Sequence, residues 1–333
     1  MKLNLFVSAQ YPAGEDMTER MRNHVHEVQI AHDAGFSGIA VGQHLSVNDL
    51  QWAPPLPLAS HLVGKVPGID VNLAVLLLPY FNPFLLAESV AFLDTITEGT
   101  LRVGIAPGWA EREFRALGVD KDRRFADFRV KAEIFRSLLR GDAIDIEGPS
   151  ETESFRLGLL PREPQGPLIQ LGTSGPKSAR NFAGLVDTLV MSGHIPLMKQ
   201  LPIREAFLNA KRELGESVGP MSINRHVMIG ESREKILQEA ASFLTKTYSK
   251  LDDWGLFSGV LNEEASPQQF EEVVLERVII GNPDDVVTGL NRVRKKLGVD
   301  TINVSIQWDG MPSGYVERAI QLIGREVLPY LDS

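Results

Sequence analysis

The feature that most constrains the fold is a regular alternation of short apolar segments with longer amphipathic ones. Eight segments have the length and composition of β-strands, and the third is apolar at almost every position, as a strand covered on both faces must be. The predicted strands are Leu3–Ala9, Gly38–His44, Val71–Leu78, Leu101–Ala106, Leu168–Gly172, Thr188–Ser192, Ser222–Ile229 and Thr301–Gln307.

The segments between these strands predict helices. In the first, Met21, Val25 and Val28 follow helical spacing, and Gly35 ends the pattern. The predicted helices are Thr18–Ala34, Pro57–Lys65, Pro83–Thr97, Ala110–Leu117, Phe125–Leu139, Pro176–Gly184, Leu197–Leu214, Arg233–Thr247, Pro283–Leu297 and Tyr315–Leu328.

Strands that alternate with helices pair in parallel through right-handed crossovers, which leaves two folds in competition: a closed eight-stranded barrel and an open doubly wound sheet. The strand count, the length of 333 residues and the lack of a linker at the midpoint favour an α/β fold of the (β/α)8 TIM-barrel type. We therefore expect residues 1–333 to form one barrel domain, although the length alone also allows two or three domains.

Two segments depart from the alternation. Ala143–Glu147 is expected to form one strand of a side hairpin. The helical rhythm is expected to break after Tyr248, and Lys250–Glu276 is predicted to be an insertion, about residues 250–280, that acts as a lid. The alternative is an inert surface excursion.

The composition excludes several classes of function. A net charge of −9 argues against a nucleic-acid binder that follows phosphates. The absence of cysteine excludes disulfides, thiolate zinc sites and cysteine nucleophiles, and it fits a cytoplasmic protein. No apolar run approaches the ~18 residues of a membrane span, and the first residues lack the pattern of a signal peptide.

The ends of the predicted strands carry the candidate site, because the active site of such a barrel lies where the carboxyl ends of the strands meet. These ends are rich in amides, hydroxyls, glycines and aromatic rings, whereas acidic pairs are scarce, which excludes a glycosidase. His44, His194 and His226 lie on different elements without accompanying carboxylates, so no metal site is predicted. The mixture suits a large planar ligand with an anionic tail.

Three stretches sharpen this expectation. The second predicted strand ends in Gln43 and His44, either because a ligand binds there or because His44 caps the strand. Leu171–Gly184 ends a strand in hydroxyls and glycines and begins a helix, which favours a phosphate, although ordinary capping is the alternative. In Ile96–Arg124, Gly108 allows close approach to the backbone, and Trp109 is either a ring contact or core.

These stretches together resemble the bacterial luciferase family of flavin-dependent monooxygenases over nearly the whole chain. The segments that carry the resemblance are AGFSGIAVGQHLS, VNLAVLLLP, LDTITEGTLRVGIAPGWAEREFRALGVD, GTSGPKSARNFA and GNPDDVVTGLNRVRKKLGVDTINVSI. The resemblance implies oxygenation of a small organic substrate by reduced FMN and O2, with the reduced flavin supplied by a separate reductase, and a homodimer. Two alternatives remain open: hydride transfer with a deazaflavin, and a non-catalytic flavin-binding homologue.

The resemblance also implies roles for individual residues. His44 is the catalytic residue and handles a proton of the oxygenated flavin or of the substrate. Ala74 and Val75 match a site where a non-proline cis peptide lies against the flavin ring. The remaining cofactor-binding residues are Gln43, Trp109, Met191, Ser192 and Gly193 around the ring, and Arg124, Gly172, Thr173, Ser174 and Ser178 toward the phosphate. Pro107 stands where that family has a phosphate-binding arginine, which leaves the deazaflavin alternative open.

Overall fold

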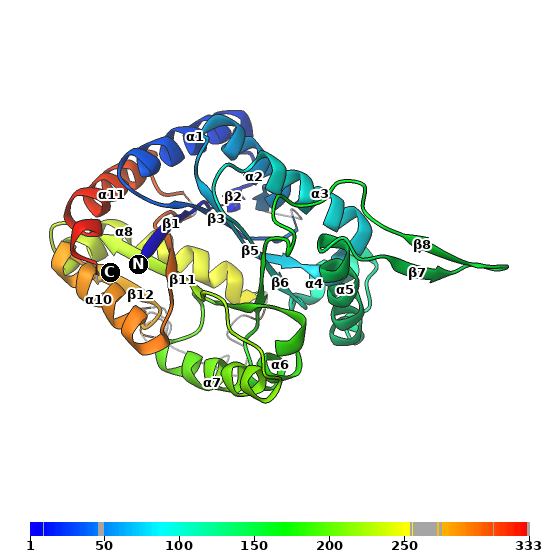
Figure 1. The fold of residues 1–333 in the computed structure, drawn as a ribbon. Helices are drawn as coiled ribbons and strands as arrows, with labels where there is room; N and C mark the ends of the chain where they lie inside the picture. The colour runs from blue at the N-terminus through cyan, green and yellow to red at the C-terminus, as the bar shows by residue number, and fades with distance from the viewer. Residues whose placement is uncertain are drawn as a thin grey trace.

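Eight parallel strands close into a barrel in the computed structural model, which describes residues 1–8, 10–45, 50–253, 255, 272, 275–308 and 310–331 (Figure 1). The strands are β1 (Lys2–Phe6), β3 (Gly38–Val41), β5 (Asp70–Leu77), β6 (Leu101–Ala106), β9 (Leu168–Gly172), β10 (Thr188–Met191), β11 (Ser222–Ile229) and β13 (Thr301–Ser305). Closure comes from the pairing of β10 with β11 and of β13 with β1. The predicted barrel is confirmed, and every barrel strand lies on its predicted segment.

Helices surround the barrel on its outside (Figure 1). They are α1 (Met17–Asp33), α2 (Pro55–Lys65), α3 (Pro83–Ile96), α4 (Glu111–Leu117), α5 (Arg124–Leu139), α6 (Pro176–Asn181), α7 (Leu197–Glu213), α8 (Arg233–Asp253), α10 (Pro283–Leu297) and α11 (Ser313–Glu326). Local signals set their ends: the Asn282 side chain completes a capping box at the start of α10, and Gly298 ends that helix with a φ of 60°. None of the described helices combines the length and apolar character of a membrane span.

The predicted break after Tyr248 is wrong, because α8 continues to Asp253. Residues 249–253 contain neither glycine nor proline, and the first glycine beyond them is Gly255, so nothing in this stretch opposes another helical turn. Most of the predicted insertion, and therefore its role as a lid, lies outside the described residues. Its described end forms β12 (Val278–Gly281), which pairs in parallel with the second half of β11.

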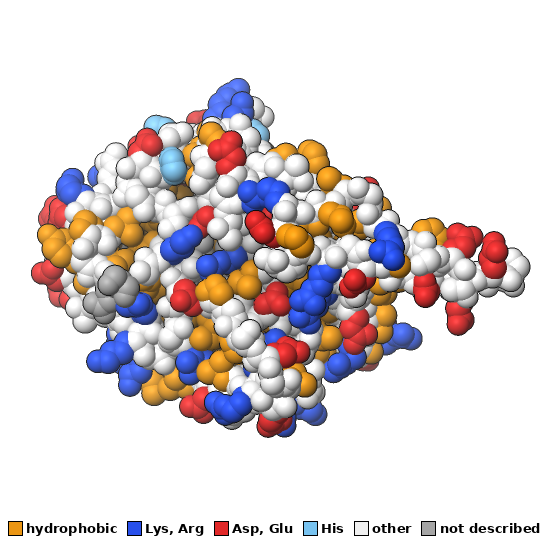
Figure 2. Space-filling view, in the orientation of Figure 1, with side chains coloured by type: hydrophobic (Ala, Val, Ile, Leu, Met, Phe, Trp, Pro, Cys, Tyr) orange, Lys and Arg blue, Asp and Glu red, His pale blue; other side chains and the backbone are white. Residues whose placement is uncertain are grey.

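The structure contains two small antiparallel sheets, of which the sequence predicted only one strand. β7 (Ile144–Glu147) pairs with β8 (Thr152–Phe155), so the side hairpin expected at Ala143–Glu147 is present; it projects from the barrel body (Figures 1 and 2). β2 (Gln10–Pro12) pairs with β4 (Leu50–Trp52), and this mini-sheet lies just beyond the carboxyl ends of β1 and β3. The mini-sheet adds a cover to one part of the barrel mouth.

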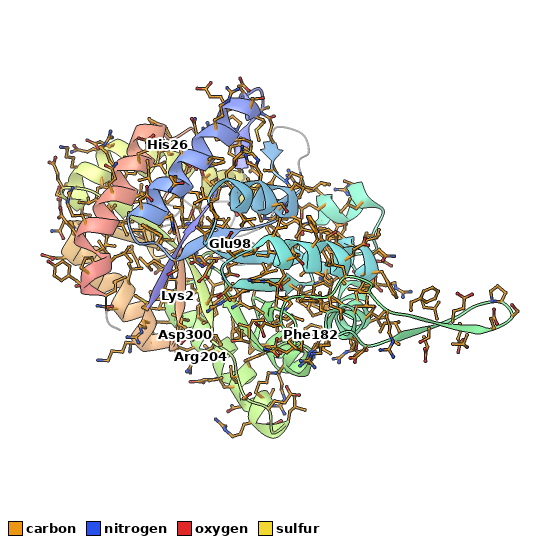
Figure 3. The ribbon with its side chains drawn as sticks, turned by 45° about the horizontal axis from the view of Figure 1, so that its top comes forward. Lys2, His26, Glu98, Phe182, Arg204 and Asp300 are labelled. Carbon is orange, nitrogen blue, oxygen red and sulfur yellow. The ribbon has the colours of Figure 1, made fainter. Side chains whose placement is uncertain are left out.

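The barrel interior is layered. Its lower layer is polar and internally bonded: Asn4 donates to Asn303 at 3.0 Å, and Gln170 donates to Ser222 at 3.0 Å. Above it, toward the carboxyl ends of the strands, Ala40, Ala74 and Val190 form a small apolar layer. Lys2 and Asp300, labelled in Figure 3, mark the opposite, amino-terminal end of the barrel. The hydrogen bonds of the polar layer help to fix the strand register, and the apolar layer forms a floor for the mouth.

A candidate active site at the barrel mouth

The floor of the mouth is formed by an irregular part of β5. The peptide bond between Ala74 and Val75 is cis, as the resemblance implied, and the pairing of β5 with β6 shifts register between Leu73 and Leu76. The Val75 side chain occupies the space beside Gly172, where an added Cβ would lie 2.8 Å from Val75 Cγ1. A glycine at position 172 thus leaves space for the Val75 side chain. The resemblance instead implied that Gly172 contacts the cofactor.

The carboxyl end of β3 carries an imidazole that is held by a buried carboxylate. Glu113 on α4 has no exposed surface, and its Oε1 lies 2.9 Å from His44 Nδ1. The same oxygen accepts the backbone N–H of Leu45 at 2.8 Å, while Oε2 accepts the Tyr80 hydroxyl at 3.3 Å. The side chain of Glu113 therefore has three partners at the mouth.

These contacts decide the charge of the pair. Burial raises the pKa of Glu113, but the hydrogen bonds and charge of His44, together with the bonds from Leu45 and Tyr80, outweigh it, and the pKa lies below the ordinary 4.5. Glu113 is therefore a carboxylate at neutral pH and can only accept hydrogen bonds. His44 must donate from Nδ1, which makes Nε2 the basic nitrogen of the ring.

Two indole rings flank His44. The Trp52 ring, from the mini-sheet, lies 4.8 Å from the imidazole at 78°, and the Trp109 ring lies 6.0 Å away at 85°. Trp52 also donates its N–H to the Gly42 carbonyl at 3.4 Å. Trp109 was expected near the ring of a ligand and does lie beside His44. Together the indoles give His44 an apolar enclosure that limits the access of water.

A second group of rings lies just beyond β10 and in the second half of β11. The His194 and His226 centroids are 5.3 Å apart, and the Tyr248 hydroxyl lies 2.8 Å from His226 Nδ1. Burial lowers the pKa of His194 to about 4, with smaller contributions from the charges of His44, Arg277 and Arg225. Burial also places the pKa of His226 well below its ordinary value. Both imidazoles are therefore neutral at pH 7.

Several predicted ring-lining residues hold the mouth together. Gln43 accepts the backbone N–H of Leu77 at 2.7 Å and so joins the ends of β3 and β5. Ser192 accepts the backbone N–H of His194 at 3.2 Å, while Met191 is buried. An added Cβ on Gly193 would lie 3.2 Å from the carbonyl of Asn224, whose side chain is 3.5 Å from the Ala74 carbonyl.

The predicted phosphate turn forms as a short helix start. Thr173 Oγ1 is 3.5 Å from the backbone N–H of Gly175, Ser174 is exposed, Ser178 is half-buried and α6 begins at Pro176. No atom lies within 4 Å of a Cβ built on Gly175, so this side of the turn is open. The turn can present hydroxyls and backbone N–H groups to an anion.

The predicted partner of that turn, Arg124, is only a neighbour. The first turn of α5 places its Nη1 2.8 Å from the Lys121 carbonyl and its guanidinium 4.3 Å from the Phe125 ring centroid. α5 and α6 are adjacent, since the Phe125 and Phe182 rings are 6.2 Å apart, and Figure 3 labels Phe182. Within the described part of the chain, Arg124 makes no hydrogen bond to the turn.

Three residues of the candidate site were not predicted from the sequence. Glu113 lies between Ala110 and Phe114 on the buried face of α4, and an acid on an apolar face was the available signal. Trp52 gave no signal, because a three-residue strand is too short for a periodic pattern. Tyr248 fell where the helix was expected to end.

Comparison with known proteins identifies the family of the chain. The family model described as luciferase-like monooxygenase matches residues 1–301. The chain therefore belongs to the luciferase-like monooxygenase family, whose members are oxidoreductases.

Among sequence relatives, 5,10-methylenetetrahydromethanopterin reductase of Archaeoglobus fulgidus is 25% identical over 91% of this chain and 94% of its own. The oxygenase component of flavin-dependent trigonelline monooxygenase from Acinetobacter baylyi is 22% identical over 99% and 95%. Alkanal monooxygenase alpha chain of Photorhabdus luminescens is 27% identical, but the match covers 42% of this chain and 38% of that one.

Solved structures share the fold across the whole chain. Monooxygenase RslO1 from Streptomyces bottropensis has a TM-score of 0.84 at 20% identity and 99% coverage of both chains. The oxygenating constituent of 3,6-diketocamphane monooxygenase from Pseudomonas putida, in complex with FMN, has a TM-score of 0.79 at 16% identity, covering 100% of this chain and 99% of its own. An F420-dependent secondary alcohol dehydrogenase has a TM-score of 0.78 at 14% identity, with the same coverage.

Proposed function

We propose that the protein is a flavin-dependent monooxygenase that uses reduced FMN and O2 to oxygenate a small organic substrate. The observation that carries the proposal is the His44–Glu113 pair, which lies among aromatic rings at the mouth of the barrel. The trigonelline relative is named as a flavin-dependent oxygenase component, and the diketocamphane neighbour was solved with FMN, which supports the same cofactor here.

The residues at the mouth fit this cofactor. Ala40, Ala74 and Val190 offer an apolar floor for a planar ring. The turn at Thr173–Ser178 would hold the phosphate, because its hydroxyls are at least partly accessible and the space beside Gly175 is open. Gln43, Trp109, Met191, Ser192 and Gly193 would surround the ring, and Arg124 would add positive charge on the neighbouring helix.

The chain's own residues then have distinct roles. Reduced FMN with O2 supplies the oxygen-transfer chemistry. Glu113 orients His44 through Nδ1, so that Nε2 can take a proton from the substrate oxygen or return one to it. Trp52 and Trp109 exclude bulk water from this nitrogen.

The proposal includes partners. A separate flavin reductase would supply reduced FMN in the cytoplasm, a requirement suggested by the name "oxygenase component" of the trigonelline relative. The proposal also includes a homodimer that forms through α3. Leu85 and Phe92 on this helix are 66% and 53% exposed, and because they are seven residues apart they lie on one side of it.

A second candidate is hydride transfer with a deazaflavin. It is favoured by the F420-dependent dehydrogenase neighbour, by the methylenetetrahydromethanopterin reductase relative and by Pro107 at the family's arginine position. The same mouth would serve, with His44 handling the proton of an alcohol or carbonyl oxygen.

One experiment separates the candidates. The protein is titrated with reduced FMN and with reduced deazaflavin, and O2 consumption is followed while small hydrophobic molecules are screened for a gain of one oxygen atom. We expect binding of FMN and O2 uptake that depends on a substrate. His44→Ala should spare FMN binding and lower product formation by about a hundredfold or more, whereas the exposed His26→Ala should not. Deazaflavin binding without O2 uptake would support the second candidate and contradict the first.

A further inference from the structure

We propose that Tyr11, His24 and Glu27 form a buried proton-holding relay that positions Trp52 against His44. The three side chains are 0–2% exposed, and they join the first helix to the mini-sheet at the mouth. His24 Nε2 lies 2.5 Å from the Tyr11 hydroxyl, and His24 Nδ1 lies 2.8 Å from Glu27 Oε2. The role in catalysis rests on the proposed function, whereas the protonation state of the relay does not.

Counting hydrogens fixes the state of the relay. The Tyr11 hydroxyl also bonds the Ser8 carbonyl, which can only accept, so the single hydroxyl proton of Tyr11 points to Ser8. The bond between Tyr11 and His24 must then use a proton on Nε2 of the imidazole. With Nε2 protonated, the hydrogen bond between Nδ1 and Glu27 needs a second proton. Either Nδ1 carries this proton and donates it to an ionised Glu27, or a protonated Glu27 donates it to Nδ1. The His24–Glu27 pair therefore holds one proton more than a neutral imidazole beside a carboxylate.

The charges around the relay are consistent with this count. Burial raises the pKa of Tyr11 far above its ordinary value, so the hydroxyl keeps its proton at neutral pH. The Arg20 guanidinium lies 5.6 Å from the Tyr11 ring centroid and is paired with Glu15, so its charge is balanced locally. Glu27 Oε1 has no hydrogen-bond partner among the described residues, which leaves His24 as the group that stabilises this buried carboxyl.

The relay reaches His44 through the mini-sheet. Tyr11 is the central residue of β2 and faces Gln51 of β4, while Gln10 faces Trp52. The Gln51 amide locks the two strands to the following loop, since it donates to the Pro12 carbonyl at 2.9 Å and to the Glu15 carbonyl at 3.0 Å. A shift of Tyr11 would therefore move β4 and, with it, the Trp52 ring that lies 4.8 Å from His44.

Loss of the extra proton would break the relay. Without it, either Tyr11 and His24 or His24 and Glu27 would face each other as two acceptors, and one bond would open. A Glu27→Gln variant offers a direct check, because its amide can donate to Nδ1 and keep Nε2 protonated without the extra proton.

The first test is independent of activity. Nitrogen-15 NMR of the histidine side chains of the whole protein, with His24 assigned by comparison with His24→Gln, should show a proton on Nε2 at neutral pH. A His24 that is protonated on Nδ1 alone would overturn the proposal. His26, on the same helix with its side chain 61% exposed, is the internal control, and its signals should be the same in the parent and in His24→Gln (Figure 3).

The second test uses the reaction. Tyr11→Phe should lower kcat/KM about tenfold through misplacement of Trp52, whereas Glu27→Gln should stay within about twofold of the parent. Equal loss of activity in Glu27→Gln and Glu27→Ala would overturn the positioning role. If the parent shows no oxygenase activity, the proposed function fails, while the NMR result still decides the state of the relay.

Discussion

The replacement Glu113→Gln isolates the charge behind His44. Oε1 of Glu113 accepts both the Leu45 N–H and His44 Nδ1, so the amide of a glutamine would keep its carbonyl toward these two donors and its N–H2 toward Tyr80. The tautomer of His44 and the shape of the site are preserved, and only the negative charge beside the imidazole is removed. The variant therefore reports on stabilisation of the protonated ring.

The expected loss of activity in Glu113→Gln follows from the hydrogen bond between His44 and Glu113. A hydrogen bond to a charged group contributes about 1.5–3 kcal/mol, and each 1.36 kcal/mol is about a tenfold change in rate. Glu113 has no exposed surface, so solvent does not screen the loss. We expect product formation to fall about ten- to a hundredfold, with little change in FMN affinity. Glu113→Ala should lose more and also destabilise the fold, because it leaves the Leu45 N–H without this acceptor.

The assay is the initial rate of substrate oxygenation with reduced FMN, measured across pH beside a thermal melt. Glu111→Gln is the matched control, since Glu111 lies on the same helix with its side chain 59% exposed and is paired only with Lys121 in the described structure. A Glu113→Gln enzyme with the rate and pH profile of the parent would refute the reasoning, because the buried charge would then have no part in the proton transfer.

Three further predictions concern stability and the floor of the site. Folding lowers the pKa of Glu113, so the ionised carboxylate adds to the free energy of unfolding. This contribution is complete above the ordinary pKa of 4.5 and is lost as pH falls through the lower pKa of the folded state. The parent and Glu113→Gln should therefore differ least in melting temperature at the most acid pH. The pKa of His194 falls from 6.5 to about 4, so the unfolded chain binds more protons between these values, and His194→Asn should reduce the acid loss of stability by up to about 1.4 kcal/mol per pH unit. Gly172→Ala would place a Cβ 2.8 Å from Val75, so it should lower the free energy of unfolding by about 1–3 kcal/mol and weaken FMN binding. Gly64→Ala is the control, because Gly64 lies on α2 with open space around it; this change should raise the free energy of unfolding by about 0.5–1 kcal/mol. Chemical denaturation measures both changes in stability.

The barrel could be predicted because its signals are local. Apolar runs such as Val71–Leu78 and helix stops such as Gly35 are recognised from neighbouring residues, and except at the end of α8 the structure places strands and helices within a few residues of the prediction. The cis bond at Ala74–Val75 was reached through resemblance, since no composition rule marks it.

The chemistry of the site depended on distant pairings. His44 and Glu113 are 69 residues apart in the sequence, and His226 and Tyr248 are 22 residues apart. Hydrophobic periodicity describes only neighbouring residues, so it could not predict either contact. The three-residue strands of the mini-sheet carry no pattern of their own, and their position depends on the Tyr11 side chain and on Gln51. The sequence thus placed His44 at the mouth but not the groups that hold and enclose it.

The most direct test of the account is an experimental structure of the protein with FMN. We predict that the ring lies over the Ala74–Val75 peptide beside His44 and that the phosphate meets the turn at Thr173–Ser178. A cavity of about 520 Å³ between α8 and α11, lined by Ile229, Tyr315 and Leu322, is the contrasting location. FMN bound there, with the mouth left to solvent, would contradict the central claim.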